Sequence, residues 1–191
     1  MNNFASGKWL NEPLDWGIES GKLNVTTGYK TDFWRYTHYG FVRDSGHFWQ
    51  LPAPKTFTAS LTFEGSYETL YDQAGLMLRV DEKNWIKCGI EHSDGMTNFS
   101  IVITRDSSDW SVIGQPLISG PQTIRITAQD NSIIAHFLKP NGTWNLMRVA
   151  DFPTTKIETI GPMACSPERC GFKASFLDFE VTNPIQNSLH S

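Results

Sequence analysis

Apolar and polar residues alternate along many short segments of the chain, and turn-forming residues separate these segments. From Phe57 to Phe63 every second residue is apolar, and the residues between them are threonine or serine. This period of two is typical of a strand that buries one face. The other alternating segments cover residues 74–80, 85–91, 98–104, 122–128, 132–138 and 171–181, and the last segment breaks its alternation in a way that predicts a bulge near 175–177.

The segments between these predicted strands have the composition of hairpin turns. Ser93-Asp94-Gly95 and Pro140-Asn141-Gly142 are two examples, and both contain residues that tolerate a positive φ. No segment keeps a period of 3.6 over three turns, so we expect very little helix. Internal repeats and long linkers are absent from the sequence. We therefore predict a single domain over residues 1–191, with a core from about 9 to 181, in which two antiparallel sheets stack as an all-β sandwich.

The composition suits such a fold and argues against two classes of partner. The 191 residues are 39% apolar and 19% charged, which is enough to bury a core without disulfides. Aromatic residues reach 13%, and they serve both strands and ligand-stacking surfaces. The net charge is −4 and no two basic residues are adjacent, so we expect no nucleic-acid partner. No apolar stretch is long enough to span a bilayer, so we expect no membrane partner.

The cysteines and the first residues predict a reducing compartment. Cys88, Cys165 and Cys170 make an odd number without the spacing of a disulfide framework. The stretch from Met1 to Gly7 lacks the basic start and apolar run of a secretory signal, so we predict a cytoplasmic protein. No second pair of cysteine or histidine residues accompanies Cys165 and Cys170, and Asp178 alone is a weak calcium ligand. We expect no metal and no cofactor.

Seven segments resemble one known family, and they occur in the same order over most of the chain, roughly from Trp9 to Val181. They are Asp32-Phe33-Trp34, Thr37 to Phe41, Asp44 to Phe48, Tyr71 to Arg79, Asn84 to Glu91, Gly161 to Glu168 and Gly171 to Phe176. The sequence is similar in these segments to the "regulation of enolase protein" family, a group within the concanavalin A-like lectin/glucanase superfamily. The resemblance implies a jelly-roll sandwich with one concave sheet, and in related members of the superfamily this face binds sugars.

The alternation in the central segments gives one set of candidate binding residues. If Leu76, Ile86 and their neighbours in phase face the core, a mixed polar and aromatic set faces outward, while Gly75 and Gly89 leave room for a ligand. Sugar sites combine an apolar plate with fixed donors and acceptors in this way. The alternative is an ordinary solvated sheet face that cross-strand pairs stabilise. The outward set is Met77, Arg79, Trp85, Lys87, Glu91 and Asn98.

A second set of candidates lies in the aromatic-rich stretch from Asp32 to Trp49. Its polar and aromatic side chains suit a pocket wall, and histidine is the side chain whose ordinary pKa lies closest to neutral pH. The alternative is that its aromatic residues belong to the core and its histidines are structural or exposed. From this stretch, and from the position just before the predicted strand 74–80, we add Asp32, Trp34, His38, His47 and Gln73 to the predicted ligand-binding residues.

No catalytic signature accompanies these residues. The Glu-x-Asp-x-x-Glu motif of the superfamily's glucanases is absent, and Glu91 is the one acid that the strand phase directs into the predicted groove. We therefore predict a non-catalytic binding module for a carbohydrate or sugar metabolite, with a regulatory role in carbohydrate metabolism. One alternative is an interaction protein that docks on a cytosolic metabolic enzyme, for which the family's name suggests enolase. The other is a glycosidase-like enzyme.

Overall fold

The computed structural model describes residues 4–115, 119–186 and 189 of the chain. The first three residues, which open the N-terminal stretch considered above, lie outside this part. Within the described part, strands dominate, and one 3-10 turn, η1 (Thr154–Lys156), is the only helical element. No helix there has the length and apolar character needed to cross a bilayer. The prediction of an all-β fold is confirmed.

Seven antiparallel strands form the first sheet, and short turns join the four strands β8 to β11 into a meander. The strand β15 returns from far along the chain and pairs with β8 on one side and β6 on the other. From edge to edge the strands are β1 (Lys8–Leu10), β6 (His47–Pro52), β15 (Thr159–Cys165), β8 (Gln73–Arg79), β9 (Asn84–Ser93), β10 (Met96–Arg105) and β11 (Ser107–Gln115).

Seven further antiparallel strands form the second sheet. The strand β16 pairs with β7, and their register shifts between Phe176 and Asp178, which confirms the bulge expected near 175–177. From edge to edge the strands are β14 (Trp144–Asp151), β13 (Ser132–Leu138), β12 (Gln122–Gln129), β7 (Phe57–Gly65), β16 (Lys173–Thr182), β3 (Lys22–Thr26) and β2 (Asp15–Glu19).

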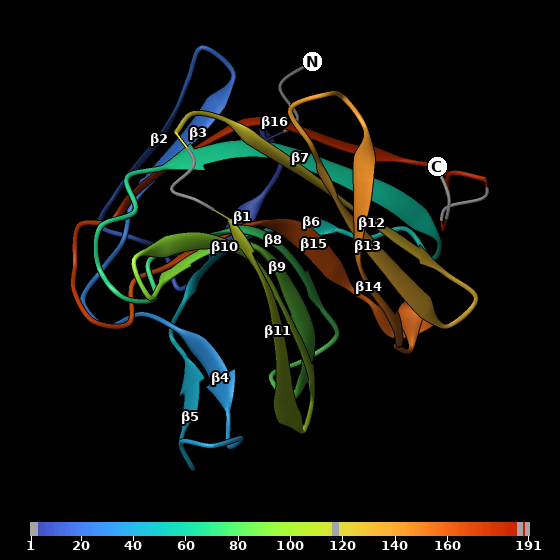
Figure 1. Cartoon of the computed structure of the whole chain (residues 1–191), viewed down its shortest axis with the longest axis horizontal. Coiled ribbons are helices and arrows are strands. Elements are labelled where there is room, and N and C mark those ends of the chain that lie inside the picture. Colours follow the sequence, from blue (N-terminus) through green and yellow to red (C-terminus); the bar gives the residue numbers. More distant parts are fainter. Residues whose placement is uncertain (1–3, 116–118, 187–188, 190–191) are drawn as a thin grey trace.

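The two sheets stack as layers, and the main core lies between them. Figure 1 shows β7 and β16 in one layer and β6, β8 and β15 in the other. The period of two decides which side chains enter this core. Phe57, Leu61 and Phe63 are buried from the second sheet, and Leu76 and Ile86 are buried from the first. The predicted two-sheet antiparallel sandwich and the predicted phase of its central strands are therefore confirmed.

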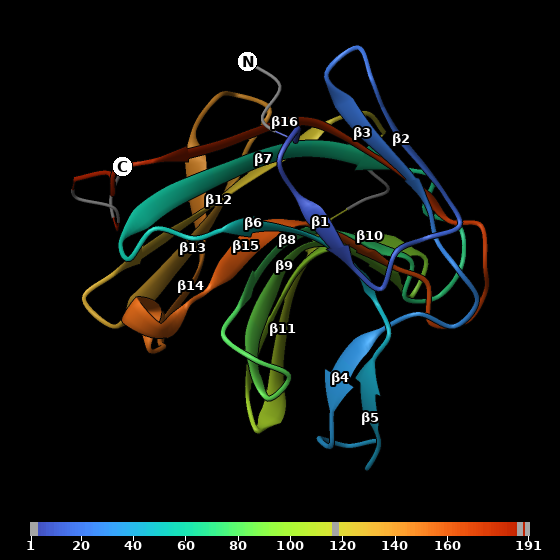
Figure 2. The same ribbon diagram turned by 180° about the vertical axis from the view of Figure 1, so that it is seen from behind.

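A two-stranded hairpin covers part of the outer face of the first sheet, which is the face turned away from the second sheet. Its strands are β4 (Phe33–Arg35) and β5 (Val42–Asp44), and both views show it projecting from the first sheet on that side (Figures 1 and 2). A second apolar cluster fills the space under the hairpin, formed by Phe33, Trp34, Phe48, Met77, Trp85, Val102, Met163 and Cys165. The outer face is therefore not the fully open groove that the sequence suggested.

The glycines of β8 and β9 serve the pairing of these two strands. Gly75 lies opposite Gly89, and a Cβ at Gly75 would stand 2.1 Å from the Cys88 carbonyl oxygen. A Cβ at Gly89 would stand 2.1 Å from the Ala74 carbonyl oxygen. Close approach of the two backbones, rather than room for a ligand, therefore accounts for both glycines.

Candidate functional site

A cavity of about 250 Å³ remains on the outer face where the hairpin leaves β8 and β9 uncovered. The hairpin, the three strands β8, β9 and β11, and two loops around residues 71 and 167 contribute its lining. We call this space the Lys87 cavity. Its lining residues are Asp32, Trp34, Tyr39, Phe41, Tyr71, Gln73, Lys87, Glu91, Trp110, Pro167 and Glu168.

A buried ion pair lies at one side of the cavity. The Lys87 ammonium is 3.1 Å from Asp32 Oδ1, and the exposed fractions of the two side chains are 4% and 14%. Burial favours loss of the lysine proton, but the charge of Asp32, its hydrogen bond and the charge of Glu91 outweigh it and raise the pKa of Lys87. Lys87 is therefore a cation within the folded protein, and Asp32 balances its charge.

A hydrogen-bond chain runs across β9, β10 and β11 on the same face. The indole Nε1 of Trp110 donates to Ser100 Oγ over 3.0 Å, and Ser100 Oγ donates to Glu91 Oε2 over 3.0 Å. Burial raises the pKa of Glu91, although the ammonium of Lys87 and the hydrogen bond from Ser100 act in the opposite direction. The chain holds the carboxyl group and the indole ring in fixed positions against the cavity.

Aromatic side chains form the other walls of the cavity. Tyr39 contacts Trp34 edge to face at 5.8 Å and stacks on Phe41 at 5.3 Å between ring centroids. Its hydroxyl lies 2.9 Å from that of Tyr71, and this hydrogen bond is the main reason why the pKa of Tyr71 is raised. Tyr71 has a φ of +65°, which is strained for an aromatic residue. Strain of this kind clusters at functional sites.

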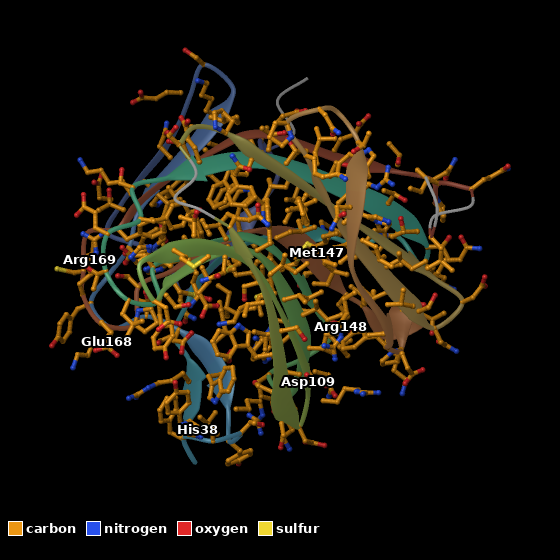
Figure 3. The ribbon with its side chains drawn as sticks, in the orientation of Figure 1. His38, Asp109, Met147, Arg148, Glu168 and Arg169 are labelled. Atoms are coloured by element: carbon orange, nitrogen blue, oxygen red, sulfur yellow. The ribbon has the colours of Figure 1, made fainter. Side chains whose placement is uncertain are left out.

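Asp72 anchors the two loops that close one end of the cavity. Its carboxylate is fully buried and accepts hydrogen bonds from the backbone N–H groups of Glu68 and Thr69. The same carboxylate accepts from Ser166 Oγ over 3.0 Å and from Arg169 Nη2 over 2.5 Å. Figure 3 shows Glu168 and Arg169 together on the second of these loops. The Asp72 carboxylate thereby fixes the loop positions of Tyr71 and Glu168.

The structure brings together five of the eleven predicted ligand-binding residues. They come from the start of the hairpin and from the adjacent strands β8 and β9, and all of them line the Lys87 cavity. These five are Asp32, Trp34, Gln73, Lys87 and Glu91. The cavity has one acidic group more than the sequence suggested, because Glu168 joins the predicted Asp32 and Glu91 in its lining.

Three predicted residues from β8 and β9 face outward as expected, but the hairpin covers them. Met77 and Trp85 belong to the second apolar cluster and have no exposed surface. Arg79 forms two hydrogen bonds of 2.8 Å with the Asp44 carboxylate, which ties the hairpin to the sheet. These three side chains hold the hairpin in place and do not line the cavity.

The other three predicted residues also lie outside the cavity. Asn98 donates to Ser93 Oγ over 2.9 Å and stays within its own hairpin. His38 is exposed at the tip of the β4–β5 hairpin (Figure 3). His47 is buried: its Nε2 accepts from the Gly28 N–H over 2.9 Å, and its Nδ1 contacts the Asn11 carbonyl at 2.5 Å. Burial lowers the pKa of His47, so this histidine is neutral and structural.

Several lining residues were not among the predicted ones. Tyr39 and Phe41 lie in the aromatic-rich stretch and were considered there, whereas Trp110 belongs to an edge strand that the sequence analysis did not identify. Trp110 and Val112 alternate with polar residues there, but Ile113 breaks the alternation, so the signal was weak. Tyr71, Pro167 and Glu168 lie in loops, where no local pattern marks a residue as part of a cavity.

Comparison with known proteins shows which family this chain is similar to. The family model described as "Protein of unknown function (DUF1349)" matches residues 9–184. The "Regulation of enolase protein 1" of Saccharomyces cerevisiae is 44% identical over 187 residues, which cover 98% of this chain and 94% of that protein. A crystal structure of a Saccharomyces cerevisiae protein described as functionally unknown has a TM-score of 0.88 and 43% identity, and the match covers 95% of this chain and 98% of that one.

More distant matches share the fold alone. The GH43 protein BlXynB from Bacillus licheniformis, as a K247S mutant, has a TM-score of 0.69 at 14% identity, and the match covers 94% of this chain but 38% of that one. The Bacteroides ovatus xyloglucan PUL GH43B has the same TM-score at 20% identity and is matched over 34% of its length. The extent and identity of the first matches confirm the likeness to the "regulation of enolase protein" family, and this chain belongs to the family described as "Protein of unknown function (DUF1349)".

Proposed function

We propose that the Lys87 cavity binds a small polyhydroxylated compound, either a sugar or a sugar-like metabolite. One observation carries this proposal: buried polar groups with unused hydrogen-bonding capacity face a cavity whose other walls are aromatic. Buried polar groups are normally paired, so unused capacity that faces a cavity indicates a place for water or a ligand.

The unused capacity includes both donors and acceptors. Among the described residues, Asp32 is the only hydrogen-bond partner of the Lys87 ammonium, which has three N–H donors. The Glu91 carboxyl uses Oε2 for Ser100, and no described residue contacts its other oxygen by a hydrogen bond. Gln73 uses its amide nitrogen for the Tyr71 carbonyl, which leaves its oxygen available. Hydroxyl groups suit this mixture because each one both donates and accepts.

The walls and the size of the cavity also suit a sugar ring. Trp110 is 40% exposed and lines the cavity, so its indole is accessible to an incoming ligand. A pyranose has apolar C–H groups that can lie on an indole ring while its hydroxyls reach the polar groups below. The volume of about 250 Å³ lies just under the usual range for ligand pockets, which starts near ~300 Å³. A single ring is therefore the expected size of ligand.

Saturation-transfer NMR followed by calorimetry with a panel of monosaccharides tests the proposal. We expect binding by the intact protein and about tenfold weaker binding by Trp110→Ala, because one packed aromatic contact contributes ~1.4 kcal/mol. Trp16→Ala is the matched control, since Trp16 on β2 is 36% exposed and lies on the other sheet. If both variants had the same affinity for every sugar that binds, this cavity would be rejected as the site. If none of the monosaccharides bound the intact protein, the proposed function would be rejected.

A second function, docking on a metabolic enzyme, is favoured by the exposed tip of the β4–β5 hairpin. Tyr36 and Arg43 are exposed on this hairpin, and the guanidinium of Arg43 lies 4.9 Å from the Phe41 ring centre. Aromatic residues with arginine are typical of interface hot spots. The name of the yeast relative suggests enolase as the enzyme to test. In biolayer interferometry, purified enolase should bind the intact protein and should bind the Tyr36→Ser variant more weakly. If enolase bound neither the intact protein nor the variant, this function would be excluded.

A further inference from the structure

The charges around the Lys87 cavity are unequal, and this imbalance bears on what the proposed sugar site accepts. Three carboxyl side chains line the cavity, those of Asp32, Glu91 and Glu168, and Lys87 is the only basic residue among the described lining residues. Asp32 already compensates Lys87 at 3.1 Å. The cavity therefore presents Glu91 and Glu168 to a ligand without a free positive charge beside them.

Two arginines near the cavity are engaged elsewhere. Arg169 follows Glu168 in the chain, but its guanidinium is held by Asp72 and Glu68. Arg79 is paired with Asp44 under the hairpin. Neither side chain is placed to receive a phosphate or carboxylate group in the cavity, although arginine forks are the usual partners of such groups.

Two further side chains carry or can carry positive charge at the rim. Arg43 lies over the Phe41 ring at 4.9 Å, and His38 contacts the Tyr39 ring edge to face at 4.8 Å. Both are exposed on the hairpin and do not line the cavity. Solvent screens exposed charges strongly, so these two weaken the negative potential of the cavity only slightly.

The aromatic walls act in the same direction as the carboxyl groups. The face of an aromatic ring is electrostatically negative and attracts a cation that lies within about 6 Å of its centre. Five aromatic side chains line the cavity, Trp34, Tyr39, Phe41, Tyr71 and Trp110. A protonated amine that enters this space meets aromatic walls and carboxylates together. A phosphate group meets the repulsion of the carboxylates and loses hydration, and the one cation in the lining, Lys87, is already paired with Asp32.

From these observations we propose that the Lys87 cavity selects its ligand by charge: it favours a polyhydroxylated compound that carries a protonated amine and excludes phosphorylated sugars. This inference rests on the proposed function, because it concerns the ligand of the same site. A cavity with this selectivity binds a free sugar or an amino sugar and rejects the phosphorylated sugar that a kinase forms from it.

The test compares matched ligands that differ in charge. Hexoses, the corresponding hexosamines and the corresponding hexose 6-phosphates of the gluco, galacto and manno series are titrated into the protein by calorimetry, at low and at high salt. We expect hexosamines to bind about three- to fivefold more tightly than the neutral hexoses at low salt, the effect of one partly exposed ion pair. This preference should shrink at high salt, and the 6-phosphates should not bind.

A charge variant at the rim links the preference to this cavity. Glu168→Gln removes one exposed carboxylate from a loop and should reduce the hexosamine preference, whereas Glu180→Gln on β16 of the second sheet should leave it unchanged. Tighter binding of a 6-phosphate than of its neutral hexose would overturn the charge selection and leave the proposed sugar site intact. If no ligand of the three series bound, the sugar site would be rejected, and the charge selection with it.

Discussion

Replacement of Lys87 by methionine should destabilise the protein strongly, because the substitution leaves the Asp32 carboxylate without its partner. Methionine keeps most of the length of the lysine side chain and removes only the charge. The two side chains are 4% and 14% exposed, so solvent reaches little of the lone Asp32 carboxylate and replaces only part of the lost interaction. Removal of one partner from a buried ion pair costs about 3–5 kcal/mol. We expect about 3 kcal/mol, because Asp32 Oδ1 keeps the hydrogen bond from the Phe33 N–H at 2.8 Å.

A double-mutant cycle isolates the interaction between the two charges. Asp32→Asn should cost less, about 1–2 kcal/mol, because Glu91 remains near the ammonium. The double variant Lys87→Met/Asp32→Asn has neither buried charge of the pair. It should therefore be less destabilised than the sum of the single variants by about 2 kcal/mol. Urea unfolding followed by tryptophan fluorescence gives each free energy of unfolding.

The exposed ion pair between Arg105 and Asp151 provides the control cycle. Its atoms are 2.9 Å apart, but the side chains are 53% and 79% exposed. The same cycle with Arg105→Met and Asp151→Asn should give a coupling energy below about 1 kcal/mol. If the Lys87 and Asp32 variants were additive within about 0.5 kcal/mol, the ion pair would contribute no coupling, and the reasoning about the buried ion pair beside the cavity would be refuted.

Three other substitutions test the anchor and the titrating groups. Asp72→Asn should cost about 3 kcal/mol and speed amide exchange in both loops that Asp72 holds, and unchanged exchange would contradict that role. Because the pKa of Glu91 is raised above the ordinary glutamate value of 4.5, this residue should make the protein less stable as the pH rises above 4.5. Glu91→Gln should reduce this fall in thermal melts, and an equal dependence of Tm on pH in both proteins would count against the raised pKa. Burial lowers the pKa of His136 to about 4, so protonation of this histidine should reduce the free energy of unfolding by about 3 kcal/mol between pH 6.5 and 4. In urea titrations at several pH values, His136→Leu should abolish most of this loss, and an unchanged loss would refute the assignment to His136.

The sequence predicted the centre of each sheet well, because these strands obey the period of two. Residues 57–63 and 122–128 of the second sheet and 85–91 of the first sheet all lie in strands, and the apolar residues that alternate along them enter the main core. Short strands such as β1 and β4 have three residues each, too few for a period to be recognised. The strand β11 has polar residues on much of its length and pairs on one side only, so burial does not impose a pattern on it.

The candidate site was harder to predict, because contacts between distant segments decide it. Strand phase correctly directed Lys87 and Glu91 away from the main core. The same phase also directed Met77, Trp85 and Arg79 outward, but the hairpin then buried all three. That hairpin is held by the Arg79 pair with Asp44 and the Lys87 pair with Asp32, which span 35 and 55 residues along the chain. Such pairings cannot be predicted from a local sequence pattern.

A crystal structure of the protein soaked with the hexose or hexosamine that binds most tightly in solution tests the central claim most directly. The account predicts a sugar ring in the Lys87 cavity, packed on Trp110, with hydroxyl groups within about 3.2 Å of Lys87 Nζ and Glu91 Oε1. A sugar bound elsewhere on the sandwich, with only water against Lys87, would contradict it.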